Sequence, residues 1–126
     1  MFNKVLFFVL FFISSFSIAK AEGPILVLNY EDAIYEQAIQ EKNKNVLLIF
    51  GADWCPSCVR LKKDLLKLDL HDYIICQIDV DQRRDLAKKY NVNRYPTSII
   101  INNKEEKSKI VGYSRFSYQK WLDKNK

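Results

Sequence analysis

The chain has 126 residues, with 20 lysines and arginines against 15 aspartates and glutamates. This length accommodates one domain of ordinary size and is too short for two. The net charge of +5 is mild and spread along the chain. The composition therefore excludes the concentrated basic surface that nucleic-acid-binding proteins use, and we expect no nucleic-acid partner.

The first twenty-one residues have the pattern of a secretory signal. Lys4 precedes an apolar run from Val5 to about Ile18, and Ala19-Lys20-Ala21 has the small-residue spacing of a cleavage site. The run of about fourteen residues is shorter than the roughly 20 that a membrane span needs. We expect residues 1–21 to be a signal peptide and residues 22–126 an exported domain, with the periplasm as its compartment. An uncleaved membrane anchor is the alternative.

The first half of the mature chain alternates apolar runs with helical patterns. Continuously apolar stretches predict strands, and apolar positions three or four residues apart predict helices. In chain order, the prediction is an edge strand over 25–28, a helix over 30–42, a buried strand over 46–50, a helix from the cysteines to about residue 68, and a central strand over 73–80.

The second half continues with a short helix over 81–90, capped by Asp81, and a strand over 97–101. Residues 102–105 predict a hairpin turn, and 107–111 the returning strand. The last helix is expected over 115–124, with four aromatic or apolar residues packing inward: Phe116, Tyr118, Trp121 and Leu122.

The predicted element order is βαβαβαββα, which is an α/β fold. Strands separated by helices predict parallel pairing, and the final hairpin adds antiparallel strands. We therefore expect a mixed central sheet flanked by helices on both faces.

Two cysteines, Cys55 and Cys58, lie between the buried strand over 46–50 and the helix that follows it. Unpaired N–H groups and the helix dipole favour an anion at a helix start, so the first thiol is easier to ionise there. The thiolate is the attacking species in thiol–disulfide exchange.

A purely structural disulfide is the alternative, but so short a loop restrains the unfolded chain little. A zinc site would need four ligands, and the sequence has no second Cys-X-X-Cys or Cys-X-X-His pair, so no metal is expected.

Four short motifs resemble those of the thioredoxin-fold thiol–disulfide oxidoreductases, over essentially the whole mature chain. Trp54-Cys55-Pro56-Ser57-Cys58 resembles the family's active site, and Asp79-Val80-Asp81 resembles the end of its third strand. Tyr95-Pro96-Thr97 resembles its cis-proline loop, and Val111-Gly112 the glycine of its last strand. The resemblance implies a thioredoxin-like domain over residues 22–126.

The resemblance also implies roles for five residues. Cys55 would be the exposed nucleophile that forms a mixed disulfide, and Cys58 the more buried thiol that resolves it; together they form the redox disulfide. Trp54 would flank the substrate groove. Pro96 would be cis and would present the Tyr95 backbone to a bound extended peptide.

The sequence departs from thioredoxin proper behind the active site. The family's buried aspartate, six residues before the first cysteine, is Ile49 here, and its nearby lysine on the third strand is Gln77. The resolving thiol must then exchange its proton through water or the substrate. Pro56-Ser57 between the cysteines contains no histidine that could stabilise the reduced form, which argues against a strong oxidant.

Three further side chains have simpler interpretations. His71 is the only histidine, and we expect it to be exposed, without a catalytic or metal-binding role. Cys76 lies within the strand over 73–80 and is expected in the core, with a third redox thiol as the alternative. Asp79 is expected to be a strand-end residue.

These observations predict an exported thiol–disulfide oxidoreductase that reduces protein disulfides. It would need no cofactor, would exchange electrons with a membrane thiol-redox partner and would be a monomer, because no dimerisation segment is visible. One alternative is a periplasmic disulfide oxidase or isomerase. Another is a non-catalytic module that binds clients or a metal through its thiols; copper would want further histidine or methionine ligands.

Overall fold

The computed structural model describes residues 25–27 and 32–126, with side chains from Tyr35 onward. The predicted signal peptide over 1–21 lies outside the described residues. In the part of the chain that the structure describes, no helix is long and apolar enough to cross a membrane. The elements are β1 (Ile25–Val27), α1 (Asp32–Gln40), β2 (Asn45–Gly51), α2 (Pro56–Asp64), a 3-10 turn (Leu65–Lys67), β3 (Tyr73–Asp79), α3 (Arg84–Lys89), β4 (Thr97–Asn102), β5 (Glu105–Val111) and α4 (Arg115–Lys124).

This element order is the predicted βαβαβαββα, and the five strands form one mixed sheet in the order β1-β3-β2-β4-β5. β1 and β2 pair with β3 in parallel, so β1 is the predicted edge strand. β4 and β5 form the predicted hairpin. Asn103 and Lys104 both have positive φ at its tip, which suits the twist of two paired strands.

β4 runs antiparallel to β2, with Phe50 opposite Thr97, so the final hairpin supplies the antiparallel strands of the mixed sheet, as expected. The segment between β3 and β4 brings Thr97 beside Phe50, at the carboxyl end of β2. The chain therefore re-enters the sheet at the end where β3 finishes.

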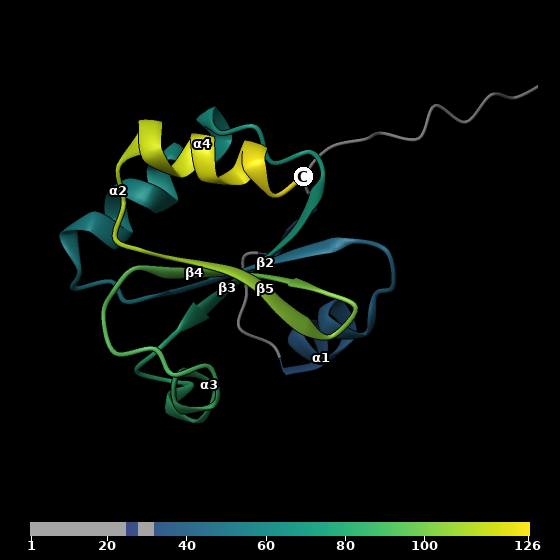
Figure 1. Ribbon diagram of the computed structural model, residues 1–126. Helices are drawn as coiled ribbons and strands as arrows, with labels where there is room; N and C mark the ends of the chain where they lie inside the picture. The colour runs from purple at the N-terminus through teal and green to yellow at the C-terminus, as the bar shows by residue number, and fades with distance from the viewer. Residues whose placement is uncertain (1–24, 28–31) are drawn as a thin grey trace, which may run out of the picture.

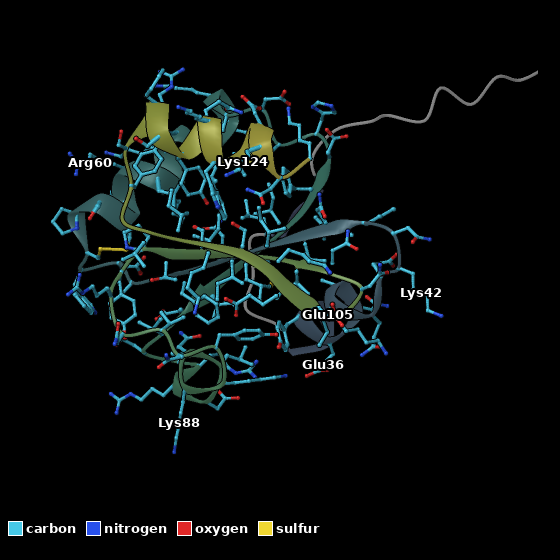
Figure 2. All side chains as sticks on the ribbon, in the orientation of Figure 1. Glu36, Lys42, Arg60, Lys88, Glu105 and Lys124 are labelled. Carbon is cyan, nitrogen blue, oxygen red and sulfur yellow. A yellow bond between two sulfur atoms is a disulfide. The ribbon has the colours of Figure 1, made fainter. Side chains whose placement is uncertain are left out.

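Helices cover both faces of the sheet, as expected: α2 and α4 lie on one face and α1 and α3 on the other (Figure 1). β2 is buried on both faces, because side chains alternate along a strand. Leu47 and Ile49 pack towards α2 and α4, whereas Leu48 and Phe50 pack towards α1 and α3. Labelled charged side chains such as Arg60, Lys88 and Lys124 point outward from the helices (Figure 2).

Two details of the helices differ from the prediction. α3 begins at Arg84 with Arg83 at its N-cap position, so Asp81 does not cap it. Phe116 is 81% exposed, whereas Tyr118 and Leu122 are fully buried. Phe116 lies two residues before Tyr118, about 200° around the helix, and therefore faces away from the sheet.

Candidate active site

The two active-site cysteines lie where β2 passes into α2. Cys55 is the N-cap residue of α2, Pro56 occupies its first turn, and Cys55 and Cys58 are joined by a disulfide. Proline suits a first helical position because its missing N–H would have no helical partner there. The Cα atoms of Cys55 and Cys58 are 5.2 Å apart, within the range that a disulfide spans. The sequence motif is therefore a bonded pair at a helix start.

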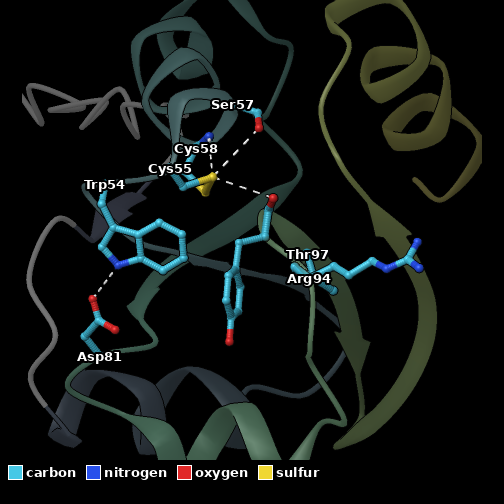
Figure 3. Close-up of a disulfide and its surroundings, with 8 residues drawn as sticks. Trp54, Cys55, Ser57, Cys58, Asp81, Arg94 and Thr97 are labelled. Atoms are coloured by element: carbon cyan, nitrogen blue, oxygen red, sulfur yellow. Dashed lines mark hydrogen bonds between the residues drawn. A yellow bond between two sulfur atoms is a disulfide. The ribbon is translucent and has the colours of Figure 1, made fainter.

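Three polar groups surround the sulfur of Cys55 (Figure 3). The Cys58 backbone N–H donates a hydrogen bond to Cys55 Sγ at 3.3 Å, and Ser57 Oγ lies 3.8 Å from the same sulfur. The Tyr95 carbonyl oxygen is 3.6 Å away, where it can accept a hydrogen bond from the reduced thiol. The first turn of α2 has no acidic residue. The N–H group and the helix dipole together favour negative charge on Cys55 Sγ.

The exposure of the two cysteines is the reverse of the expected order. Cys55 is 5% exposed, whereas Cys58 is only partly buried. Cys55 Sγ is enclosed by the Tyr95 carbonyl and the first turn of α2. Cys58 instead faces a pocket on the far side of that turn.

Trp54 and Tyr95 form an aromatic pair beside the disulfide. The Trp54 side chain is 65% exposed and meets the Tyr95 ring edge-on, with centroids 5.9 Å apart. Its indole Nε1 donates a 2.8 Å hydrogen bond to Asp81 Oδ2, drawn as a dashed line in Figure 3. Asp81, predicted as a helix cap, thus fixes the ring that flanks the active site.

The Tyr95–Pro96 loop has the geometry that the resemblance implies. The Tyr95–Pro96 peptide bond is cis, and Pro96 is buried. Thr97 Oγ1 donates a hydrogen bond to the Arg94 carbonyl at 2.6 Å, and the Gly112 N–H donates one to the Pro96 carbonyl at 2.7 Å. Gly112 has a φ of 82°, which a residue without Cβ adopts without cost. These bonds hold the Tyr95 backbone against the disulfide.

A small pocket lies behind Cys58. Ile49 and Gln77, noted in the sequence as departures, are register partners in β2 and β3, and both line it. A Cβ atom on Gly51 would lie 3.2 Å from Cys58 Sγ, so the glycine permits a close approach of α2 to the strand. Gly51 is not part of the predicted motif; its signal in the sequence is a glycine that ends a buried strand just before the cysteines.

Cys76 and His71 lie outside this site. Cys76 is 4% exposed among the residues packed towards α1 and α3, and burial raises the pKa of its thiol to about 11. Adjacent strand residues point to opposite faces, so the sheet separates Cys76 from the pocket that Gln77 lines. His71 is exposed, as predicted, and contacts Asp69 and Asp72. No cluster of three or more potential metal ligands occurs among the described residues.

The Thioredoxin family model matches residues 26–124. The chain belongs to the thioredoxin family. Thioredoxin H3 of Arabidopsis thaliana is 30% identical over 111 residues, which cover 84% of this chain and 93% of that protein. Thioredoxin of Buchnera aphidicola is 32% identical over 82 residues, covering 63% of this chain and 75% of the relative.

Solved structures agree with this assignment. The X-ray structure of Fasciola hepatica thioredoxin has a TM-score of 0.66 and 26% identity, covering 73% of this chain and 91% of that chain. The predicted thioredoxin-like fold is therefore confirmed. With its Cys55–Cys58 pair, this member of the thioredoxin family is a thiol–disulfide oxidoreductase that acts on protein disulfides.

Proposed function

We propose that this chain is an exported reductase of protein disulfides, in which Cys55 is the nucleophile and Cys58 the resolving thiol. The observation that carries the proposal is the position of Cys55 Sγ at the start of α2, where the Cys58 N–H donates to it. This hydrogen bond and the helix dipole favour the thiolate that attacks a substrate disulfide.

The reaction has two exchange steps. The Cys55 thiolate attacks one sulfur of the substrate disulfide, forms a mixed disulfide and releases the other substrate sulfur as a thiolate. Cys58 then loses its proton and attacks Cys55 Sγ, and the second substrate sulfur leaves with the bonding electron pair. The protein ends as the Cys55–Cys58 disulfide and the substrate as two thiols. A partner must then supply two electrons to reduce the protein again.

The substrate groove is proposed to run past Trp54, Tyr95 and Pro96. The exposed Trp54 ring offers apolar contact area beside the disulfide. The cis Pro96 bond leaves the Tyr95 backbone facing the sulfurs, with its carbonyl 3.6 Å from Cys55 Sγ. An extended peptide with a cysteine could pair with this backbone, since an extended chain leaves its N–H and C=O groups free to do so.

Export, electron source and the monomeric state are parts of the proposal that rest on the sequence. The pattern over residues 1–21 supports secretion into an oxidising compartment, where a reductase needs a membrane thiol-redox partner to return it to the dithiol state. The absence of histidine between the cysteines supports the reducing direction. The second candidate is a disulfide oxidase or isomerase on the same site.

The first test is the reduction potential of the Cys55–Cys58 couple, measured on residues 22–126 in glutathione buffers. A reductase is expected near the thioredoxin value of about −270 mV. A value near the oxidising end, about −120 to −180 mV, would reverse the proposed direction and favour the oxidase or isomerase.

The second test separates the roles of the two cysteines. Cys58→Ser should accumulate a stable mixed disulfide with an unfolded, disulfide-containing protein, because the resolving thiol is missing. Cys55→Ser should trap nothing, and Cys76→Ala should behave as the wild type. Trapping by Cys55→Ser through Cys58 would overturn the assignment of the nucleophile.

A further inference from the structure

The pocket behind Cys58 is lined by one buried polar side chain, Gln77, among mostly apolar residues; its two charged lining residues, Asp53 and Lys62, are exposed. Ile49 and Gln77 lie opposite each other in β2 and β3, and both side chains face α2. Gly51 adds no side chain, and Leu61 closes the pocket from the helix. The cavity among them has a volume of about 40 Å³, and Cys58 borders it. A buried amide and the resolving cysteine therefore line the same small space.

The Gln77 amide is not satisfied by the protein around it. The side chain is 7% exposed, and its Nε2 has no hydrogen-bond partner among the described residues. Leaving a buried N–H unpaired is costly, and such groups are commonly paired with ordered water. A polar cavity needs about 10–15 Å³ to hold one water molecule, so this pocket is large enough.

We propose that Gln77 is a positioning residue that holds a water molecule against Cys58, and that this water accepts the Cys58 proton in the resolving step. The inference rests on the proposed function, since it concerns the second exchange step. Gln77 Nε2 donates a hydrogen bond to the water oxygen. The remaining lone pair of the water faces the Cys58 thiol.

The proton and the electrons then move separately. The Cys58 S–H bond breaks, its proton passes to the water, and its electron pair forms the bond to Cys55 Sγ. The bond between Cys55 and the substrate breaks, and the substrate sulfur leaves as a thiolate that takes a proton from solvent. The water passes its extra proton to solvent past Asp53 and Lys62, exposed residues that also line the pocket. Glutamine stays neutral throughout, so it positions the water and does not itself accept the proton.

The test uses dithiobis(nitrobenzoate) with the reduced protein in equimolar amounts. Each protein releases one coloured thiol when Cys55 attacks and a second when Cys58 resolves the mixed disulfide, so stopped-flow absorbance separates the two steps. Gln77→Met keeps the side-chain length and removes the N–H. We expect it to slow the second phase about tenfold near neutral pH and to leave the first phase unchanged. The difference should shrink at alkaline pH, where hydroxide takes the Cys58 proton directly.

Cys76→Ala is the matched control, because it changes the neighbouring residue of β3 on the opposite face of the sheet. The proposal is overturned if Gln77→Met has a wild-type second phase at every pH, if it is slowed equally at every pH, or if Cys76→Ala slows the phase as much. A first phase of wild-type rate in Cys55→Ser would instead count against Cys55 as nucleophile, so the two failures are distinguishable.

A measurement on the unmodified protein keeps the test decisive if Gln77→Met does not fold. In deuterium oxide, the second phase should slow while the first phase, an attack by an existing thiolate, stays nearly constant. An equal solvent isotope effect on both phases would overturn the proposal.

Discussion

The Trp54 indole N–H donates to Asp81, a residue 27 positions further along the chain, and this single bond sets one wall of the active site. Trp54 is largely exposed, so burial alone does not fix its ring. The edge-on contact with Tyr95 restrains it from the other side. The two contacts therefore hold an exposed aromatic ring beside the disulfide before any substrate binds. Pre-ordering of this kind lowers the entropy cost of binding.

We expect Asp81→Ala to lower kcat/KM for a protein disulfide about threefold to tenfold, because the lost hydrogen bond to a carboxylate leaves the Trp54 ring free to turn. Steady-state reduction of insulin measures this change. Asp81→Asn keeps an oxygen acceptor and should retain most of the activity. Equal activity of Asp81→Ala and the wild type would show that the bond does not position Trp54 for catalysis.

At the scale of elements, α4 is tied to the hairpin by side-chain hydrogen bonds as well as by packing. Tyr118 is fully buried, and its hydroxyl donates to Ser98 Oγ of β4 at 2.7 Å. Trp121 Nε1 donates to Ser108 Oγ of β5 at 2.8 Å. Burial raises the pKa of Tyr118, so the phenol stays protonated and keeps donating. These bonds fix how α4 lies across the strands.

Tyr118→Phe should reduce the free energy of unfolding by about 1–2 kcal/mol, because it leaves the buried Ser98 hydroxyl without this partner. The double variant Tyr118→Phe/Ser98→Ala removes both polar groups and should recover most of that loss. Urea denaturation of the four proteins of this cycle gives the coupling energy. Additive effects of the two substitutions would contradict the expected coupling.

At the scale of the whole molecule, the end of α4 is fastened to the segment that precedes β3. Lys126 Nζ contacts Asp69 Oδ2 at 2.6 Å, and Asn45 donates to the Asn125 carbonyl at 2.9 Å. The hydrogen bonds from Lys126 and then His71 lower the pKa of Asp69 to about 2. The hydrogen bond and charge of Asp69, followed by the charge of Asp72, raise the pKa of His71. These exposed charges link the C-terminal residue Lys126 to the loop that precedes β3.

This cluster predicts a pH dependence with a definite sign. The pKa of His71 is raised in the folded state, so its stabilising effect is complete below its ordinary value of 6.5 and is lost as the pH rises through the folded value. The wild type should therefore melt at a higher temperature than His71→Asn at about pH 5, and at the same temperature at about pH 9.

Calorimetric melting curves at the two pH values check this, and added salt should shrink the difference at acidic pH, because the charges are exposed. A constant difference at both pH values would contradict protonation as its cause. The Asp69 contribution has the opposite sign: it is present above pH 3.8 and is lost as the pH falls towards 2.

Local patterns along the chain were sufficient to predict the helices, the strands and the reactive cysteine pair. The continuous apolar runs over 46–50 and 73–80 became the central strands β2 and β3, because burial on both faces requires apolar residues at every position. The hairpin turn at Asn103 and the start of α2 at the cysteines were also predictable, because turns and helix starts depend on neighbouring residues. These features are local in the chain.

Local patterns did not predict four features: the position of β4 beside β2, the outward face of Phe116, the bond from Trp54 to Asp81 and the greater burial of Cys55. Each depends on groups distant in the sequence: Cys55 is covered by the Tyr95 carbonyl, 40 positions away. The position of the Gln77 amide beside Cys58 likewise depends on a residue distant in the sequence. Hydrophobic periodicity and turn residues indicate whether a segment forms a helix, a strand or a turn. The residues that a segment contacts are set by packing across the sheet, and no local pattern in the sequence specifies them.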